Sequence, residues 1–287
     1  HTENTEAYQL YLKGRYFWNK RNVDGFKKAI DYFQQAIDKD PNYALAYAGL
    51  ADCYGVLTNY HVLAPNESIP KARVAALKAL EIDDTLAEAH CILAGIKHEH
   101  EWDFPGAERL FKRAIMLNPN YATAHQWYAE YLTTMGRHPE ANAEIRRAQE
   151  VDPLSLIINV MAGATYHFAR QYDESIEQSL KTIEMDSNFY YAHAFLGKAY
   201  AQKGMHEQAV AELQKATDLS EDDFLVVAWL GHAYAGAGKK GEALTVLKKL
   251  EGLSKRRYVS PADVALVYAG LGEKDQAFVW LEKAYAK

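Results

Sequence analysis

Residues 190–221, YYAHAFLGKAYAQKGMHEQAVAELQKATDLSE, decide the fold of this chain. Apolar and small side chains recur there every three or four positions on both sides of Gly204, which is the spacing of one face of an α-helix. Glycine readily adopts the left-handed conformation that ends many helices. The stretch therefore predicts two antiparallel helices joined by a short turn at Gly204.

The same pattern returns along most of the chain at intervals of 34 residues. Antiparallel helices that cross closely leave room only for a methyl group or a hydrogen, so small residues are expected at each crossing. One series of small residues is Ala107, Ala141, Ser175, Ala209, Ala243 and Ala277. A second is Gly95, Ala129, Gly163, Gly197, Gly231 and Ala265. A mostly aromatic series at the same interval is Leu132, Tyr166, Tyr200, Tyr234 and Tyr268.

These features resemble the tetratricopeptide repeat family, which has small residues at its helix contacts, Tyr late in the first helix and Pro at the end of the repeat. Pro41, Pro119 and Pro153 occupy that last place here. The resemblance implies an all-α, right-handed superhelical solenoid, and we expect residues 1–287 to form one such domain of about eight repeats. The expected repeats are 8–41, 44–84, 87–119, 122–153, 156–187, 190–221, 224–255 and 258–287.

Two of the expected repeats are longer than the others. Ala29 and Ala72 are 43 residues apart, so about nine extra residues fall in the turn-rich segment 57–69. The first repeat carries about three extra residues around 22–25. We expect both insertions to form loops at one edge of the stack.

Composition excludes several classes of protein. Hydrophobic residues make up 49% of the chain and charged residues 24%, which excludes an intrinsically disordered chain. The longest apolar run, residues 224–230, is far shorter than the roughly 18 residues of a membrane-spanning helix. The net charge is −6 and no five like charges are adjacent, so we expect no nucleic-acid partner.

The two cysteines, Cys53 and Cys91, are too few for a disulfide framework, and we expect both to be reduced and buried. The chain begins at His1 and resembles a piece of a longer protein. We expect a cytoplasmic location. A periplasmic one stays open if a preceding segment carries a membrane span.

A narrower resemblance concerns the proteins in which such repeats occur. Residues 7–16, 101–132 and 253–285 are similar to the C-terminal repeat regions of bacterial multidomain signalling proteins. Those proteins carry a winged-helix DNA-binding domain, a nucleotide cyclase or a serine/threonine kinase in their amino-terminal part. The resemblance implies that this chain is a docking or sensory part of a larger signalling protein.

The family resemblance also implies a binding groove on the concave side, lined by the first helix of each repeat. Reading the groove positions from the later repeats gives an unusually apolar lining, which favours a binding patch for a partner. The alternative is that the stack itself buries these side chains. The predicted groove residues are Tyr8, Tyr11, Arg15, Asp52, Ile157, Val160, His167, Phe168, Tyr191, Lys198, Gln202, Leu225 and His232.

Some members of the family bind peptide C-termini through a clamp of Lys, Arg and Asn. Arg15 has no converging basic residue in the groove positions of the first repeats, so we expect no such clamp. The amino-terminal groove is mixed and rather acidic and suits a basic or extended peptide. Tyr8, Tyr11 and Trp18 offer amphipathic contact area there.

No enzyme or cofactor signature occurs. The sequence contains no glycine-rich phosphate loop, no Gly-x-Ser-x-Gly, no His-Glu-x-x-His and no Cys-x-x-Cys. His98 and His100 invite a metal hypothesis, but residues two apart on a helix point about 200° apart. We expect them to be solvated residues at a helix end, and we expect no metal and no cofactor.

The sequence thus predicts a non-enzymatic module that binds a protein or peptide in its groove. One alternative is a self-association module that forms a homodimer through the final helix, where Val279, Trp280, Leu281 and Tyr285 are apolar. A second alternative is a small-molecule sensor in the aromatic groove between Tyr166 and Phe195. An enzyme is the least favoured reading.

Overall fold

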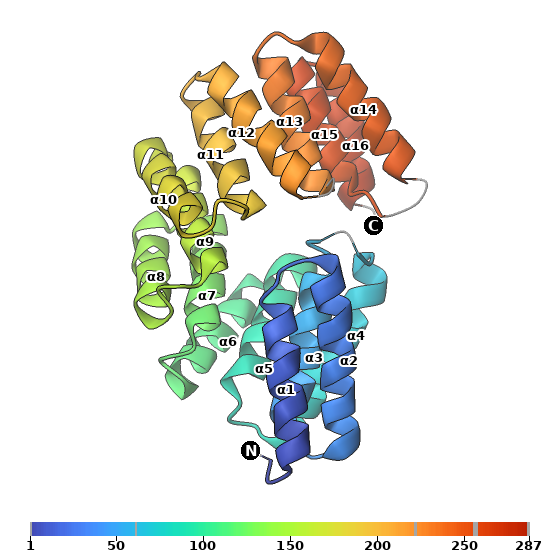
Figure 1. Ribbon diagram of the computed structural model, residues 1–287, viewed down its shortest axis with the longest axis vertical. Helices are drawn as coiled ribbons and strands as arrows, with labels where there is room; N and C mark the ends of the chain where they lie inside the picture. The colour runs from blue at the N-terminus through green and yellow to red at the C-terminus, as the bar shows by residue number, and fades with distance from the viewer. Residues whose placement is uncertain (1, 61, 221–222, 255–257, 286–287) are drawn as a thin grey trace. The chain divides into compact units, whose positions relative to one another are not determined.

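The computed structural model describes residues 2–60, 62–220, 223–254 and 258–285. These residues form sixteen α-helices and one π-helical turn, and no strand occurs among them (Figure 1). None of these helices is both long and apolar enough to cross a bilayer. The chain divides into two compact units, His1–Tyr131 (unit 1) and Leu132–Lys287 (unit 2), and the boundary falls inside α7 (Ala122–Thr134).

Unit 1 consists of consecutive helix pairs that lead into the start of α7. The members of each pair pack against each other, α1 on α2, α3 on α4 and α5 on α6. The helices are α1 (Thr5–Trp18), α2 (Val23–Lys39), α3 (Ala44–Val56), α4 (Pro65–Ile82), α5 (Ala87–Ile96) and α6 (Phe104–Leu117).

Unit 2 repeats the same arrangement, with α9 on α10, α11 on α12, α13 on α14 and α15 on α16 (Figure 1). Its helices after α7 are α8 (His138–Val151), α9 (Leu156–Phe168), α10 (Tyr172–Met185), α11 (Tyr190–Gln202), α12 (His206–Leu219), α13 (Phe224–Gly236), α14 (Lys240–Ser254), α15 (Pro261–Leu271) and α16 (Lys274–Tyr285). The predicted all-α solenoid of helix-turn-helix repeats is therefore confirmed.

The small residues of the 34-residue series lie where helices cross, as predicted. In the first series, five residues are completely buried and Ala277 is nearly so. The five are Ala107, Ala141, Ser175, Ala209 and Ala243. At Gly197 a Cβ would lie 2.7 Å from Leu213 Cγ and 3.0 Å from the backbone oxygen of Ala209, so the α11–α12 crossing has no room for a larger residue. The predicted burial of both free cysteines, Cys53 and Cys91, is also confirmed.

The turns inside the helix pairs depend on left-handed backbone conformation. Glycines occupy this position in four pairs, with φ between +71° and +78° at Gly136, Gly204, Gly238 and Gly272. In the pair α9–α10 the same place is taken by Arg170, with φ +60°. A residue with a Cβ is strained in this conformation, so this turn carries a cost that the other four avoid.

The prediction that both insertions are loops is wrong in part. The helix α2 begins at Val23 and has 17 residues, so the first insertion mainly lengthens a helix. The helix α4 begins at Pro65 and has 18 residues, so residues 65–69 of the second insertion are helical. Ser68 and Ile69 are buried within unit 1, and Ser68 Oγ donates to the backbone oxygen of Tyr54; both features stabilise this extension.

Candidate functional site

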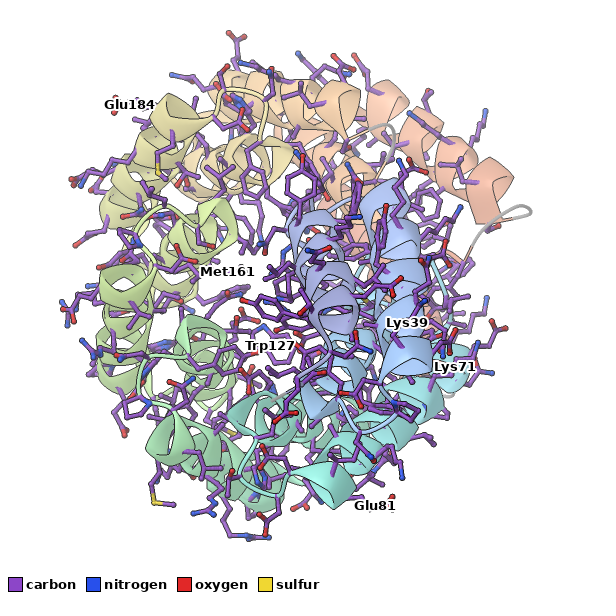
Figure 2. All side chains as sticks on the ribbon, turned by 60° about the horizontal axis from the view of Figure 1, so that its bottom comes forward. Lys39, Lys71, Glu81, Trp127, Met161 and Glu184 are labelled. Atoms are coloured by element: carbon purple, nitrogen blue, oxygen red, sulfur yellow. The ribbon has the colours of Figure 1, made fainter. Side chains whose placement is uncertain are left out.

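The predicted groove residues of the later repeats belong to the first helices of the pairs in unit 2. They lie on α9, α11 and α13, the first helices of three consecutive pairs, which contact one another. In Figure 2, Met161 of α9 and Glu184 of α10 point to opposite sides of the helix layer. We call this surface the first-helix face of unit 2. It comprises Ile157, Val160, Ala164, His167, Phe168, Tyr191, Ala194, Lys198, Gln202, Leu225, Ala228 and His232.

Burial divides these residues into two groups. The stack itself buries Val160, His167 and the three alanines. Phe168 is 55% exposed and Gln202 is exposed as well. The remaining members are half-buried: Ile157, Tyr191, Lys198, Leu225 and His232. Part of the lining is therefore core, and part is free to contact a ligand.

Lys198 lies among three aromatic rings from three different helices. Its Nζ atom is 5.1 Å from the ring centroid of Phe168, 4.6 Å from that of Phe195 and 4.1 Å from that of Trp229. Within the described residues it makes no hydrogen bond and no ion pair. Phe195 borders the aromatic groove predicted from the sequence, whereas Trp229 does not occupy a predicted groove position and carries no sequence signal for this site.

The electrostatics of this surface follow from burial. Burial lowers the pKa of Lys198 to about 7. Burial also lowers the pKa of His167 to about 4, and the nearby Lys198 charge adds to that effect. The pKa of His232 is lowered by the same two causes. None of these three side chains forms an ion pair in the described part of the chain, so the surface is apolar with uncompensated basic groups.

The predicted groove residues of unit 1 form a different arrangement. Tyr8 is exposed, and Tyr11 packs its ring against Phe33 at a centroid distance of 5.7 Å. Arg15 donates to Asp52 at 2.8 Å, and only 1% of the Asp52 surface is exposed. The structure therefore places Asp52 inside the stack, paired with Arg15, and not at the surface.

Arg15 keeps its positive charge although its side chain is largely buried. Burial alone would lower the pKa of Arg15, but Asp52, together with Tyr121 and Tyr11, outweighs that effect, and the pKa is raised. The Arg15 guanidinium also lies 4.2 Å from the ring centroid of Trp18, and that of Arg21 lies 3.5 Å from it. Both cations thus contact Trp18, and Arg15 is held by its partner carboxylate.

His98 and His100 lie in the π-helical turn Lys97–Glu101, which follows α5. Both are half-buried, and burial lowers the pKa of both imidazoles. The expectation of solvated residues is therefore corrected: the His98 ring packs on Tyr131 at a centroid distance of 5.3 Å. In the part of the chain that the structure describes, no three His, Cys, Asp or Glu residues are placed to hold a metal ion.

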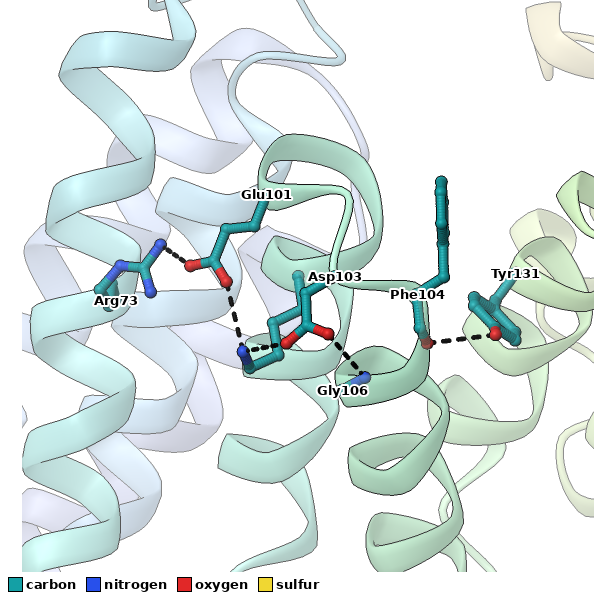
Figure 3. A network of polar contacts seen from close by, with 7 residues as sticks. Arg73, Glu101, Asp103, Phe104, Gly106 and Tyr131 are labelled. Carbon is teal, nitrogen blue, oxygen red and sulfur yellow. Dashed lines mark hydrogen bonds and ion pairs between the residues drawn. The ribbon is translucent and has the colours of Figure 1, made fainter.

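A network of polar contacts fixes this π-helical turn (Figure 3). Glu101 pairs with Arg73 of α4 and accepts from Lys97 at 3.4 Å. Lys97 also contacts Asp103 at 2.6 Å, and Asp103 accepts from the backbone N–H of Gly106 at 2.9 Å. The network serves to join α4, the turn and the start of α6, which is a structural role.

Comparison with known proteins shows what this chain is similar to. Residues 197–238 match the family model described as TPR repeat. The transcriptional regulator HilA of Salmonella paratyphi A is 26% identical over 176 residues, which are 61% of this chain and 31% of that protein. The Hsp70-Hsp90 organizing protein 2 of Arabidopsis thaliana is 32% identical over 88 residues, 31% of this chain and 15% of that protein. The chain thus spans a third or less of these relatives.

Solved structures share the fold over nearly the whole chain. The human IFIT1 dimer with PPP-AAAA has a TM-score of 0.71 at 16% identity, covering 96% of this chain and 72% of that one. The APC/C hetero-tetramer Cut9-Hcn1 has a TM-score of 0.71 at 16% identity, covering 99% of this chain and 54% of that one. Residues 197–238 thus match the TPR repeat model, and the chain shares its fold with these solved helical-repeat structures.

Proposed function

We propose that this chain is a non-enzymatic module that binds a protein or peptide partner on the first-helix face of unit 2. Tetratricopeptide repeats generally mediate protein–protein interaction. The single observation that carries the proposal is the exposure of Phe168, 55% of whose surface is accessible on the first-helix face of unit 2. An exposed aromatic ring on an apolar face is typical of a binding anchor.

The partner best suited to this surface is an extended or helical segment with apolar side chains. Ile157, Tyr191 and Leu225 are half-buried, so their outer atoms remain available for contact. Tyr191 adds a hydroxyl to its apolar ring, which suits an interface that combines burial with hydrogen bonding. By this proposal the chain serves as a docking part of a larger signalling protein, and the similarity to part of a transcriptional regulator supports that context.

The test selects peptides from a random displayed library with the purified chain and measures their affinity by fluorescence anisotropy. Phe168→Glu should weaken binding roughly tenfold or more, because it places a charge at the anchor. The matched control is Leu180→Glu on α10, since Leu180 is also an exposed apolar residue but lies on a second helix. Equal affinities for the parent and Phe168→Glu would contradict the proposed surface.

A small-molecule site on the same face is the second candidate function. The observation that favours it is the arrangement of three aromatic rings around Lys198, which forms a local apolar enclosure with one polar atom. A thermal-shift screen separates the two candidates, because a small ligand raises the melting temperature without any peptide. Peptide binding without any small-molecule hit would remove this second candidate.

A further inference from the structure

Three helices of unit 2 enclose a cleft that is separate from the first-helix face. It lies between α12, α13 and α14, of which α13 packs against both others (Figure 1), and its volume is about 240 Å³. Its floor consists of the buried side chains of Val227, Leu230 and Val246. Tyr234, which is half-buried, and Glu242, which is exposed, also line it. The cleft therefore combines an apolar floor with polar groups closer to solvent.

The 34-residue repeat explains why this space is open. One repeat earlier, the two valines of the floor correspond to His193 and Glu212, and His193 Nδ1 lies 2.6 Å from Oε2 of Glu212. Two repeats earlier they correspond to Asn159 and Gln178, and Gln178 Nε2 donates to Asn159 Oδ1 at 3.2 Å. Each of these contacts joins the first helix of a pair to its second helix. Valines are shorter and form no hydrogen bond, so between α13 and α14 the corresponding space is left as a cleft.

One end of the cleft presents hydrogen-bond acceptors. Tyr234 Oη donates to Gln214 Oε1 at 3.1 Å, and Gln214 Nε2 donates to Asp218 at 2.9 Å, so the hydroxyl proton and one amide proton are already used. Burial raises the pKa of Tyr234, and the charges of Glu242 and Asp218 add to this effect. Lys249 also lines the cleft, but it follows Glu242 by seven residues, which is about 10 Å along α14. The end at Tyr234 therefore favours a cation.

We propose that this cleft is a binding site for small aromatic amines. The aromatic ring packs on Val227, Leu230 and Val246, which exclude water from it. The ammonium group lies at the Glu242 carboxylate and the Tyr234 oxygen. An apolar cavity of about 150 Å³ holds benzene, so a cleft of about 240 Å³ has room for a ring and a two-carbon amine chain. No residue of the cleft belongs to the first-helix face, so this binding is independent of the proposed peptide binding.

The first experiment titrates the intact chain with 2-phenylethylamine at pH 7 and follows the binding by protein-observed NMR. We expect saturable binding with a Kd of about 1 mM or below. 2-Phenylethanol has the ring without the charge, and ethylamine has the charge without the ring, so each should bind at least about tenfold more weakly. No saturation at about 10 mM amine, or equal affinity for the amine and the alcohol, would overturn the proposal.

A variant of Glu242 tests the ammonium contact. Glu242→Gln should weaken binding of 2-phenylethylamine at least about tenfold, because it removes the negative charge from the cleft. Glu207→Gln is the matched control, since Glu207 is also an exposed glutamate in the first turn of a second helix, α12, but does not line the cleft. Equal affinities of the two variants for the amine would overturn the proposal.

A double substitution tests the floor of the cleft. Val227→His with Val246→Glu copies the His193–Glu212 contact into the pair α13–α14, so the new side chains should fill the cleft and abolish binding of 2-phenylethylamine. Unchanged binding in a folded double variant would overturn the proposal. Glu242→Gln changes an exposed residue, so the test of the ammonium contact remains decisive even if the double variant does not fold.

Discussion

At the scale of single residues, burial sets the chemistry of the basic side chains in unit 2. His167 is 8% exposed, its ring packs edge-on against Phe168 and Tyr172, and its Nδ1 atom has no hydrogen-bond partner. A charged imidazole is costly there, and the neighbouring Lys198 makes it costlier. Folding therefore favours the neutral form of this imidazole, and this makes stability depend on pH.

The first prediction concerns His167 and acid. Its pKa is lowered from 6.5 to about 4 in the folded chain, so between these values the unfolded chain binds more protons. Stability is therefore fully present above pH 6.5 and is lost as pH falls toward 4. At pH 5 this one group should cost about 2 kcal/mol relative to pH 7.5. Urea unfolding of His167→Leu should show a correspondingly smaller loss between the two pH values.

The control for this prediction is His206→Gln, because His206 is an exposed histidine at the start of α12. That variant should keep the full pH dependence of the parent. If His167→Leu loses as much stability as the parent on going from pH 7.5 to 5, another group causes the acid sensitivity.

The sequence predicts which helices carry the candidate site, but it does not predict the state of the site's residues. The family resemblance, applied to the 34-residue repeat, predicts Phe168, Lys198 and Leu225 as groove residues, because the spacing fixes which positions correspond from one repeat to the next. It did not reveal the Arg15–Asp52 ion pair, which depends on how closely α1 approaches α3. Ion pairing and burial arise from tertiary packing, which a periodic pattern does not specify.

At the scale of elements, the inter-helix turn at Arg170 predicts a stabilising substitution. Four other turns place glycine in this left-handed conformation, and Arg170 adopts it with φ +60°. Arg170→Gly should stabilise the chain by about 1 kcal/mol, because the steric cost of the Cβ exceeds the entropy lost by glycine. The converse change, Gly204→Arg, should destabilise by a similar amount. Urea unfolding measures both, and a destabilised Arg170→Gly would contradict the argument.

The register of the helix crossings makes a separate prediction. Ala209 of α12 is completely buried against α11, whereas Ala211 of the same helix is exposed. Ala209→Leu should cost roughly 1–3 kcal/mol or more by overpacking the crossing. Ala211→Leu adds the same atoms to the same helix and should change stability by less than about 0.5 kcal/mol. Thermal or urea unfolding of the two variants, if identical, would show that the register is misplaced.

The helices α2 and α4 are longer than predicted, because residues that were expected to form turns instead begin these helices. Asn22 was part of a segment expected to loop out, but its side chain accepts from the backbone N–H of Gly25 at 2.8 Å and so caps α2. Pro65 likewise stands at the first position of α4. Asn, Pro and Ser begin helices as readily as they form turns, so the residues that suggested a loop also favour a longer helix.

At the scale of the whole molecule, the chain is a series of similar helix pairs. These pairs fall into two compact units. In such proteins each pair is stabilised mainly by its neighbours. The interval of 34 residues was enough to predict this architecture, because the same contacts recur in every pair. The expectation that residues 1–287 form a single domain concerns how the two units are joined, and it stays a prediction.

The last prediction concerns self-association through α16. This helix buries Ala277 and leaves a set of apolar side chains exposed, including Phe278 at 65% and Tyr285 at 76%. Apolar surface of this kind is stabilised when another copy covers it, and the same patch on two copies can form a closed, twofold interface. Sedimentation equilibrium should therefore show an average mass that rises with protein concentration.

The double substitution Phe278→Lys and Leu281→Lys should shift this equilibrium toward monomer, since it would place like charges in the twofold contact. Leu154→Lys is the matched control, because Leu154 is the most exposed large apolar residue of the described chain and lies before α9, away from α16. Equal loss of association in Leu154→Lys would point to nonspecific apolar contact. If the parent chain sediments as a monomer at every concentration, the homodimer prediction is wrong, because the apolar face of α16 then remains exposed in solution.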